Sequence, residues 1–239
     1  MDVIGKGGVR IFFSVPNIFT LLNIAFGFLG LYFCILEDFK LAFLCIFLAI
    51  VSDGLDGFIA RKLNAVSDFG RELDSLCDMV SFGVTPAVMF LMSMGNGVPI
   101  VLSLFVAIIY VAFGSLRLAR FNIYGSKEFF EGLAIPAAAF FECLVVICIA
   151  PLSPFASIVL TMVTAILMIS TIRFPSMKTR EGVRAIGVAI LVGIAYFIAF
   201  SLYIPGIMES IEAIAYWIMF SIMMSYITTS PMIFGLLGG

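Results

Sequence analysis

Long uncharged apolar stretches constrain this chain more than any other feature of its sequence. Four of them reach about 18 residues, the length that a helix needs to cross the hydrocarbon core of a bilayer: Ile18–Leu36, Val98–Leu116, Phe155–Ile172 and Ala185–Tyr203. Hydrophobic residues make up 63% of the chain and charged residues only 12%, whereas a soluble domain carries about 25% charged residues. Water cannot solvate so apolar a surface, so we predict that membrane lipids surround most of the protein.

Four further segments complete a predicted bundle of about eight transmembrane helices. They are slightly shorter or carry a few acids: Leu41–Arg61, Gly70–Met94, Leu133–Ala150 and Ala213–Thr229. Their apolar runs are continuous, which argues against the alternating strands of a membrane barrel. The predicted fold class is all-α, a polytopic transmembrane bundle in one domain over residues 1–239. Residues 1–14, which include Lys6 and Arg10, predict a short N-terminal segment at the membrane interface.

Basic side chains are distributed asymmetrically over the connections between these helices. In an eight-helix topology, twelve of the thirteen Lys and Arg residues fall on one side of the membrane and only Lys40 falls on the other. Short loops rich in Lys and Arg stay in the cytoplasm. We therefore predict a multi-pass protein of the cell membrane with both termini in the cytoplasm.

Several residues within the spans predict helix contacts. Gly27, Gly30 and Gly114 lack side chains, and small residues let helix backbones approach closely in lipid. Glu142 is a lone acid in an apolar span, and we expect it to contact another helix or a second copy of the chain.

The residue types that are missing exclude several classes of active site. The chain has no histidine, so Ser-His-Asp catalysis, Cys-His catalysis and histidine-based metal sites are excluded. Its five cysteines all lie in or beside apolar spans, where we expect free, buried thiols. A general base must then be a carboxylate, lysine, tyrosine or cysteine. We expect no nucleic acid among the partners.

Four aspartates lie around the connection between the second and third predicted helices. Asp53 and Asp56 are three residues apart, and Asp74 and Asp78 are four apart, so each pair lies on one helical face. A short turn near Asn64–Asp68 makes the two helices antiparallel neighbours. The two pairs can therefore face each other near the cytoplasmic interface.

These aspartates predict a divalent metal site. Four carboxylates in one place resist joint ionisation, especially beside hydrocarbon, and one or two cations offset their repulsion. Oxygen-only ligands favour Mg²⁺, Mn²⁺ or Ca²⁺ over Zn²⁺. Two such ions suit displacement at phosphorus, because they neutralise the phosphate oxygens and the leaving group. The alternative is a helix-end charge cluster in which Asp53 and Asp56 pair with Arg61 and Lys62.

The aspartates belong to a longer pattern, D-x2-D-G-x2-A-R-x8-G-x3-D-x3-D. Its eight fixed positions are Asp53, Asp56, Gly57, Ala60, Arg61, Gly70, Asp74 and Asp78. This pattern resembles the signature of the CDP-alcohol phosphotransferase family, and the flanking helices extend the likeness over the first six spans. The resemblance implies a homodimeric enzyme. Its catalytic core would be formed by the helices between about residues 16 and 172, and residues 185–229 would add two helices.

The resemblance also implies roles for the residues of the pattern. Asp53, Asp56 and Asp74 would bind two divalent ions, Mg²⁺ or Mn²⁺, and Ca²⁺ could also occupy the site. Asp78 would lie close to the same metals and act as the general base toward an alcohol. Gly57, Ala60 and Gly70 would line the cytidine pocket of a CDP-lipid, whose pyrophosphate the metals hold.

Three polar residues outside the acid pairs are further candidates for binding the CDP-lipid. Asn17 and Thr20 share the cytoplasmic level of the four acids, although Asn17 can instead cap the first helix. Arg61 lies about two turns beyond Asp53, where it can meet a phosphate or an acid of the next helix.

Three other stretches narrow the acceptor alcohol. VPNIFTLLN at 15–23, SFGVTPA at 81–87 and FGSLRLARFN at 113–122 resemble the phosphatidylserine synthase branch of the family. This resemblance implies transfer from CDP-diacylglycerol or CDP-archaeol to L-serine, with release of CMP. Arg117 and Arg120 would present a fork to the serine carboxylate, or they anchor the helix at lipid headgroups.

Two other functions stay open at this point. The same chemistry can serve another acceptor, such as glycerol 3-phosphate or an inositol phosphate, because these too would use arginines. A cation transporter is the distant alternative, since intramembrane carboxylates often mark ion pathways. The four acids all lie at one end of their helices, which argues against a pathway.

Overall fold

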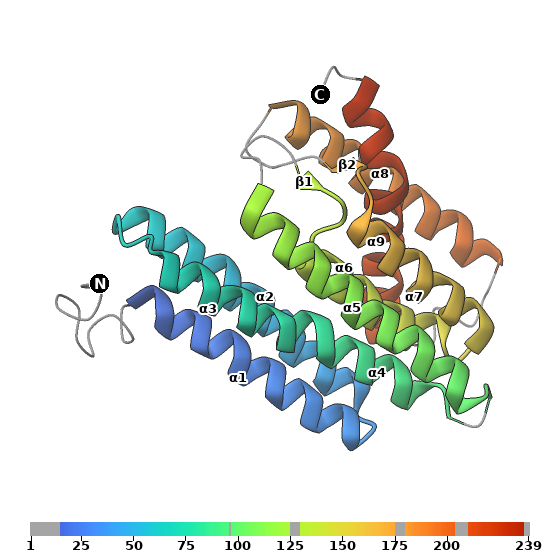
Figure 1. The fold of residues 1–239 in the computed structure, drawn as a ribbon. Coiled ribbons are helices and arrows are strands. Elements are labelled where there is room, and N and C mark those ends of the chain that lie inside the picture. Colours follow the sequence, from blue (N-terminus) through green and yellow to red (C-terminus); the bar gives the residue numbers. More distant parts are fainter. Residues whose placement is uncertain (1–14, 96, 125–129, 175–179, 204–209, 237–239) are drawn as a thin grey trace.

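The computed structural model is a helical bundle, drawn as a ribbon in Figure 1. The described residues are 15–95, 97–124, 130–174, 180–203 and 210–236. The predicted interfacial segment 1–14 lies outside them. Within the described residues, the only strands are β1 (Phe130–Glu131) and β2 (Arg173–Phe174), which pair antiparallel.

The helices agree with the eight predicted spans. Their bounds are α1 Val15–Ile35, α2 Phe39–Lys62, α3 Asp68–Asp78, α4 Thr85–Ser93, α5 Ile100–Tyr124, α6 Ile135–Leu144, α7 Pro154–Ile169, α8 Arg180–Tyr203 and α9 Ile211–Leu236. A π-helical turn at Met79–Val84 joins α3 to α4, and a second at Val145–Ile149 lengthens α6. The described part of the chain therefore contains eight helical spans.

Five of these spans are long and apolar enough to cross a membrane. They are α1, α2, the continuous helix 68–93, α5 and residues 211–233 of α9. The three other described spans are apolar but shorter, at 135–149, 154–169 and 183–199. The prediction of a multi-pass, all-helical membrane protein is thereby confirmed.

Helix α1 turns a stripe of small and polar residues toward the bundle. Its buried residues recur every three or four positions: Pro16, Asn17, Thr20, Asn23, Gly27, Gly30 and Cys34. An added Cβ at Gly27 would lie 2.7 Å from the Cα of Ser81, and one at Gly30 would lie 3.2 Å from Thr85. The predicted close contacts at both glycines are confirmed, and they bring α1 against the π-helical turn that joins α3 to α4.

The remaining helices pack around this unit. In Figure 1, α1 lies along α2 and the α3–α4 helix, α5 packs along α7, and α8 packs mainly on α9. Gly114 of α5 approaches Ile135 of α6, as predicted for a small residue. Glu142 is fully buried in α6 and accepts a hydrogen bond of 2.8 Å from Thr161 of α7, which confirms it as a helix-contact residue. All five cysteines are free and buried, also as predicted.

The contact at Gly27 leads to a prediction about stability. We expect Gly27→Ala to lower the free energy of unfolding by about 1–3 kcal/mol, because the new methyl group overpacks the backbone at Ser81. Gly187→Ala in α8 is the matched control, since its methyl group meets nothing within 4 Å and alanine favours the helix. Thermal unfolding in detergent measures both changes. Equal melting temperatures for the two variants would contradict the close packing of α1.

Candidate active site

Three aspartates converge where the end of α2 meets the start of α3. One carboxylate oxygen from each of Asp53, Asp56 and Asp74 lies within 4.8 Å of the other two. One oxygen of Asp74 is buried without a hydrogen-bond partner. Carboxylate oxygens are the ligands that Mg²⁺ and Mn²⁺ prefer. The three side chains therefore fit a divalent cation, and we call them the three-acid group.

The fourth aspartate, Asp78, lies outside the three-acid group and is hydrogen-bonded to α1. Its Oδ1 accepts a hydrogen bond of 2.9 Å from the side-chain amide of Asn23. Asp78 is buried, with 6% of its surface exposed, and it interacts electrostatically with Asp53 and Asp74. It therefore lies beside the group without belonging to it.

Helix α1 supplies donors to two of the four acids. Thr20 Oγ1 donates to Asp56 Oδ2 at 2.7 Å, and Asn23 donates to Asp78 one turn further along. Both donors lie on the buried stripe of α1. The inward face of this helix thus sets the positions of an acid from α2 and an acid from α3.

A cavity of about 430 Å³ opens beside the three-acid group. Its lining includes every residue predicted to bind the CDP-lipid: Asn17, Thr20, Gly57, Ala60, Arg61 and Gly70. Asp56, Asp74 and Phe121 also line it. Gly70 has no side chain, which widens the cavity at this point; a Cβ there would lie 3.4 Å from the Oδ1 of Asn17. Its volume lies in the range of sites for small molecules.

The position of Asn17 within α1 tests its alternative role as a helix cap. The helix already includes Val15 and Pro16, so Asn17 lies inside its first turn and its side chain lines the cavity. The predicted alternative, in which Asn17 is the residue that caps this helix, is therefore wrong.

The two arginines that were predicted to form a fork take different directions. The guanidinium group of Arg117 is buried, interacts electrostatically with Asp78 and Asp53, and lies 5.2 Å from the ring centre of Phe121. The Arg120 guanidinium instead donates to backbone carbonyls of four residues: Glu131, Met168, Ile169 and Ser170. It ties α5 to β1 and to the end of α7. Only Arg117 faces the acids.

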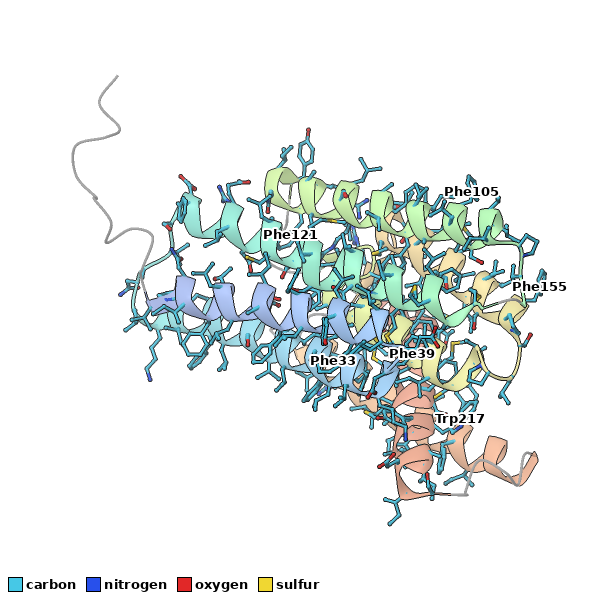
Figure 2. All side chains as sticks on the ribbon, turned by 90° about the horizontal axis from the view of Figure 1, so that it is seen from below. Phe33, Phe39, Phe105, Phe121, Phe155 and Trp217 are labelled. Carbon is cyan, nitrogen blue, oxygen red and sulfur yellow. The ribbon has the colours of Figure 1, made fainter. Side chains whose placement is uncertain are left out.

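Two residues of the site were missed in the sequence. Asn23 follows Thr20 by three positions on the same helical face, and this spacing was the signal that could have found it. Phe121 follows Arg117 by four positions and lines the cavity. Figure 2 shows Phe121 at the end of α5 nearest the start of α1, opposite the end marked by Phe105.

Comparison with known proteins agrees with this geometry. The family model of the CDP-alcohol phosphatidyltransferases matches residues 13–229. The CDP-diacylglycerol–serine O-phosphatidyltransferase of Methanocaldococcus jannaschii is 38% identical over 192 residues, which cover 79% of this chain and 89% of the relative. The enzyme of the same name from Bacillus subtilis is 38% identical over 165 residues, covering 69% and 91%.

A third relative differs in the name of its product. The archaetidylserine synthase of Methanothermobacter thermautotrophicus is 36% identical over 131 residues, which cover 54% of this chain and 55% of the relative. The family model alone spans well over half of the sequence. On this basis, the chain belongs to the CDP-alcohol phosphatidyltransferase family of membrane transferases.

Proposed function

We propose that the protein transfers a phosphatidyl-type group from a CDP-lipid to the hydroxyl group of L-serine and releases CMP. The reaction depends on divalent metal, Mg²⁺ or Mn²⁺, held by the three-acid group with Asp78 close by. One observation carries the proposal: a buried arginine, Arg117, interacts electrostatically with Asp78, the acid that also interacts with Asp53 and Asp74 of the three-acid group. The names of the relatives from Methanocaldococcus jannaschii and Bacillus subtilis support serine as the acceptor.

In this proposal the cavity residues bind and orient the donor. The nucleotide lies against Gly57, Ala60 and Gly70, where the backbone is accessible, with Asn17 and Thr20 at the same level. Arg61 lines the same cavity and provides positive charge for the pyrophosphate. Bound divalent ions would neutralise the pyrophosphate oxygens and the departing CMP.

Asp78 and Arg117 act on the acceptor. The Arg117 guanidinium group binds the serine carboxylate, and Asp78 takes the proton of the serine hydroxyl. A bond forms between the serine oxygen and the lipid-side phosphorus, while the bond from that phosphorus to the CMP oxygen breaks. Arg120 acts indirectly in this scheme, because its donors are bound to backbone carbonyls at the end of α7.

The arrangement in the membrane is part of the proposal. The end of α2, the start of α3 and the end of α5 lie at the same end of the bundle in Figure 1, and they carry Arg61, Lys62, Arg71, Arg117 and Arg120. This asymmetry supports an active site at the cytoplasmic face. Residues 16–172 would form the catalytic core, and α8 and α9 the two additional helices. A homodimer stays a prediction from the family resemblance.

An assay of CMP release tests the acceptor. We expect purified enzyme with CDP-diacylglycerol and Mn²⁺ to release CMP at least 100-fold faster with L-serine than with glycerol 3-phosphate or inositol phosphate. A site built to pair a particular polar group discriminates by about 10⁴-fold or more, so 100-fold is a modest demand. CDP-archaeol in place of CDP-diacylglycerol tests the donor tails. A faster reaction with either phosphorylated alcohol would overturn serine as the acceptor and leave the family chemistry intact.

A further inference from the structure

Asn23 is a buried amide that does more than fill space between helices. None of its surface is exposed, its Nδ2 donates to Asp78 Oδ1 at 2.9 Å, and its own Oδ1 is buried without a partner. A buried polar atom without a hydrogen bond costs about 1–3 kcal/mol. A leucine of similar shape would avoid this cost. The amide therefore serves its one bonded partner, the carboxyl group of Asp78.

The backbone around Asn23 is clamped against the third span. Ser81 Oγ donates to the carbonyl oxygen of Asn23 at 3.0 Å, and Thr85 Oγ1 donates to that of Gly27 at 3.0 Å. The missing side chain of Gly27 lets the two backbones approach closely enough for these bonds. With its backbone fixed on the same span that carries Asp78, the Asn23 side chain has little freedom to leave its partner.

We propose that Asn23 is a positioning residue for the transfer reaction: it holds Asp78 Oδ1 and thereby directs Asp78 Oδ2 toward the acceptor hydroxyl. The inference rests on the proposed function. The proton of the serine hydroxyl passes to Oδ2 as the serine oxygen bonds to phosphorus and the bond to the CMP oxygen breaks. Asn23 is too deeply buried to touch the substrate, so it acts through Asp78 alone.

The substitution Asn23→Leu tests this role. We expect kcat for CMP release to fall by about 10–100-fold, a part of the 10²–10⁴-fold that a general base contributes. The KM values for CDP-lipid and L-serine should change by less than about threefold, because neither substrate touches Asn23. The solvent deuterium isotope effect on kcat should rise, since proton transfer to a poorly aligned Asp78 becomes slower. The melting temperature should change little, because the variant no longer buries the unpaired Asn23 oxygen but leaves Asp78 Oδ1 without its donor, and the two effects oppose each other.

Thr164→Val is the matched control. Thr164 is buried, as Asn23 is, but its hydroxyl group donates to the carbonyl oxygen of Leu160 within α7 at 2.8 Å and not to the acids. The substitution removes this hydrogen bond. Its kcat and isotope effect should equal those of the wild type. Asn23→Ala serves as a second variant if the leucine prevents folding, because it removes the amide without adding bulk.

The outcomes separate this inference from the proposed function. Wild-type enzyme that releases no CMP with L-serine overturns the function itself. Wild-type activity with serine, together with an unchanged kcat in a folded Asn23→Leu or Asn23→Ala variant, overturns only the role of Asn23. A loss of kcat that comes with higher KM values and an unchanged isotope effect also overturns it, because it indicates a structural role.

Discussion

Asp78→Asn is expected to lower the rate of CMP release by about 10²–10⁴-fold while the protein still folds and binds CDP-lipid. Asparagine has the shape of aspartate, and its Oδ1 can still accept the hydrogen bond that Asn23 donates. It cannot take a proton from the acceptor hydroxyl. Single-turnover CMP release measures the chemical step, and equilibrium binding of CDP-lipid measures the donor site.

The control for this variant is another Asp→Asn change near the same turn. Asp68 begins α3, is exposed, and pairs with Arg71 at 2.9 Å outside the four acids. Its substitution by Asn should change the rate by less than about twofold, since exposed ion pairs contribute little. If Asp78→Asn retained the wild-type rate, Asp78 would not be the base and a different proton acceptor would have to be sought.

Removal of divalent ions is the second change with a large expected effect. A chelator should lower CMP release by roughly 10²-fold or more, because bound ions supply several kcal/mol of charge stabilisation. Mg²⁺ or Mn²⁺ should restore the rate and raise the melting temperature, by an amount equivalent to about 2.7 kcal/mol at 100 times the dissociation constant. Full activity in the chelator would contradict a metal-dependent reaction.

Asp53→Asn distinguishes loss of the metal site from a general loss of structure, because it should raise the melting temperature of the metal-free protein. In the metal-free protein the three-acid group crowds like charges, so we expect the variant to melt about 2–4 °C higher per kcal/mol of repulsion relieved. The same variant should lose the metal-induced rise in melting temperature together with its activity. A lower melting temperature in the metal-free state would contradict mutual repulsion among these carboxylates.

Most of the helical architecture could be predicted because a helix that crosses the bilayer needs a long apolar run, which is visible in the sequence. All eight predicted spans recur within a few residues at most of their ends. The clearest difference is α5, which continues past the end of its apolar run at Leu116 to Tyr124, because its last turns are charged and polar. Helices can extend beyond the hydrocarbon, and their hydropathy does not mark where they stop.

The site was predictable where spacing along one helix decides the geometry. The helical repeat and one tight turn were enough to predict the pairing of Asp53 with Asp56 and of Asp74 with Asp78. Asn64 lies in that turn and has a positive φ of 51°. Arg120 was harder, because three positions along a helix also rotate a side chain by about 60°. That rotation takes its guanidinium group to carbonyls at the end of α7, and backbone carbonyls have no sequence signature. The role of Asn23 could not be identified from the sequence alone either, because it depends on Asp78, which lies 55 residues further along the chain.

The bonds from α1 to the acids also impose an order on biogenesis. Asn23 leaves the ribosome 55 residues before Asp78, the partner that its amide binds. At a synthesis rate of about 5–20 residues per second, this separation corresponds to roughly 3–11 s. Over that interval, the first helix must carry its polar stripe through the insertion machinery or the bilayer without the contacts that later bury it. The bond between Asn23 and Asp78 can therefore form only when the third of the eight helices arrives in the membrane.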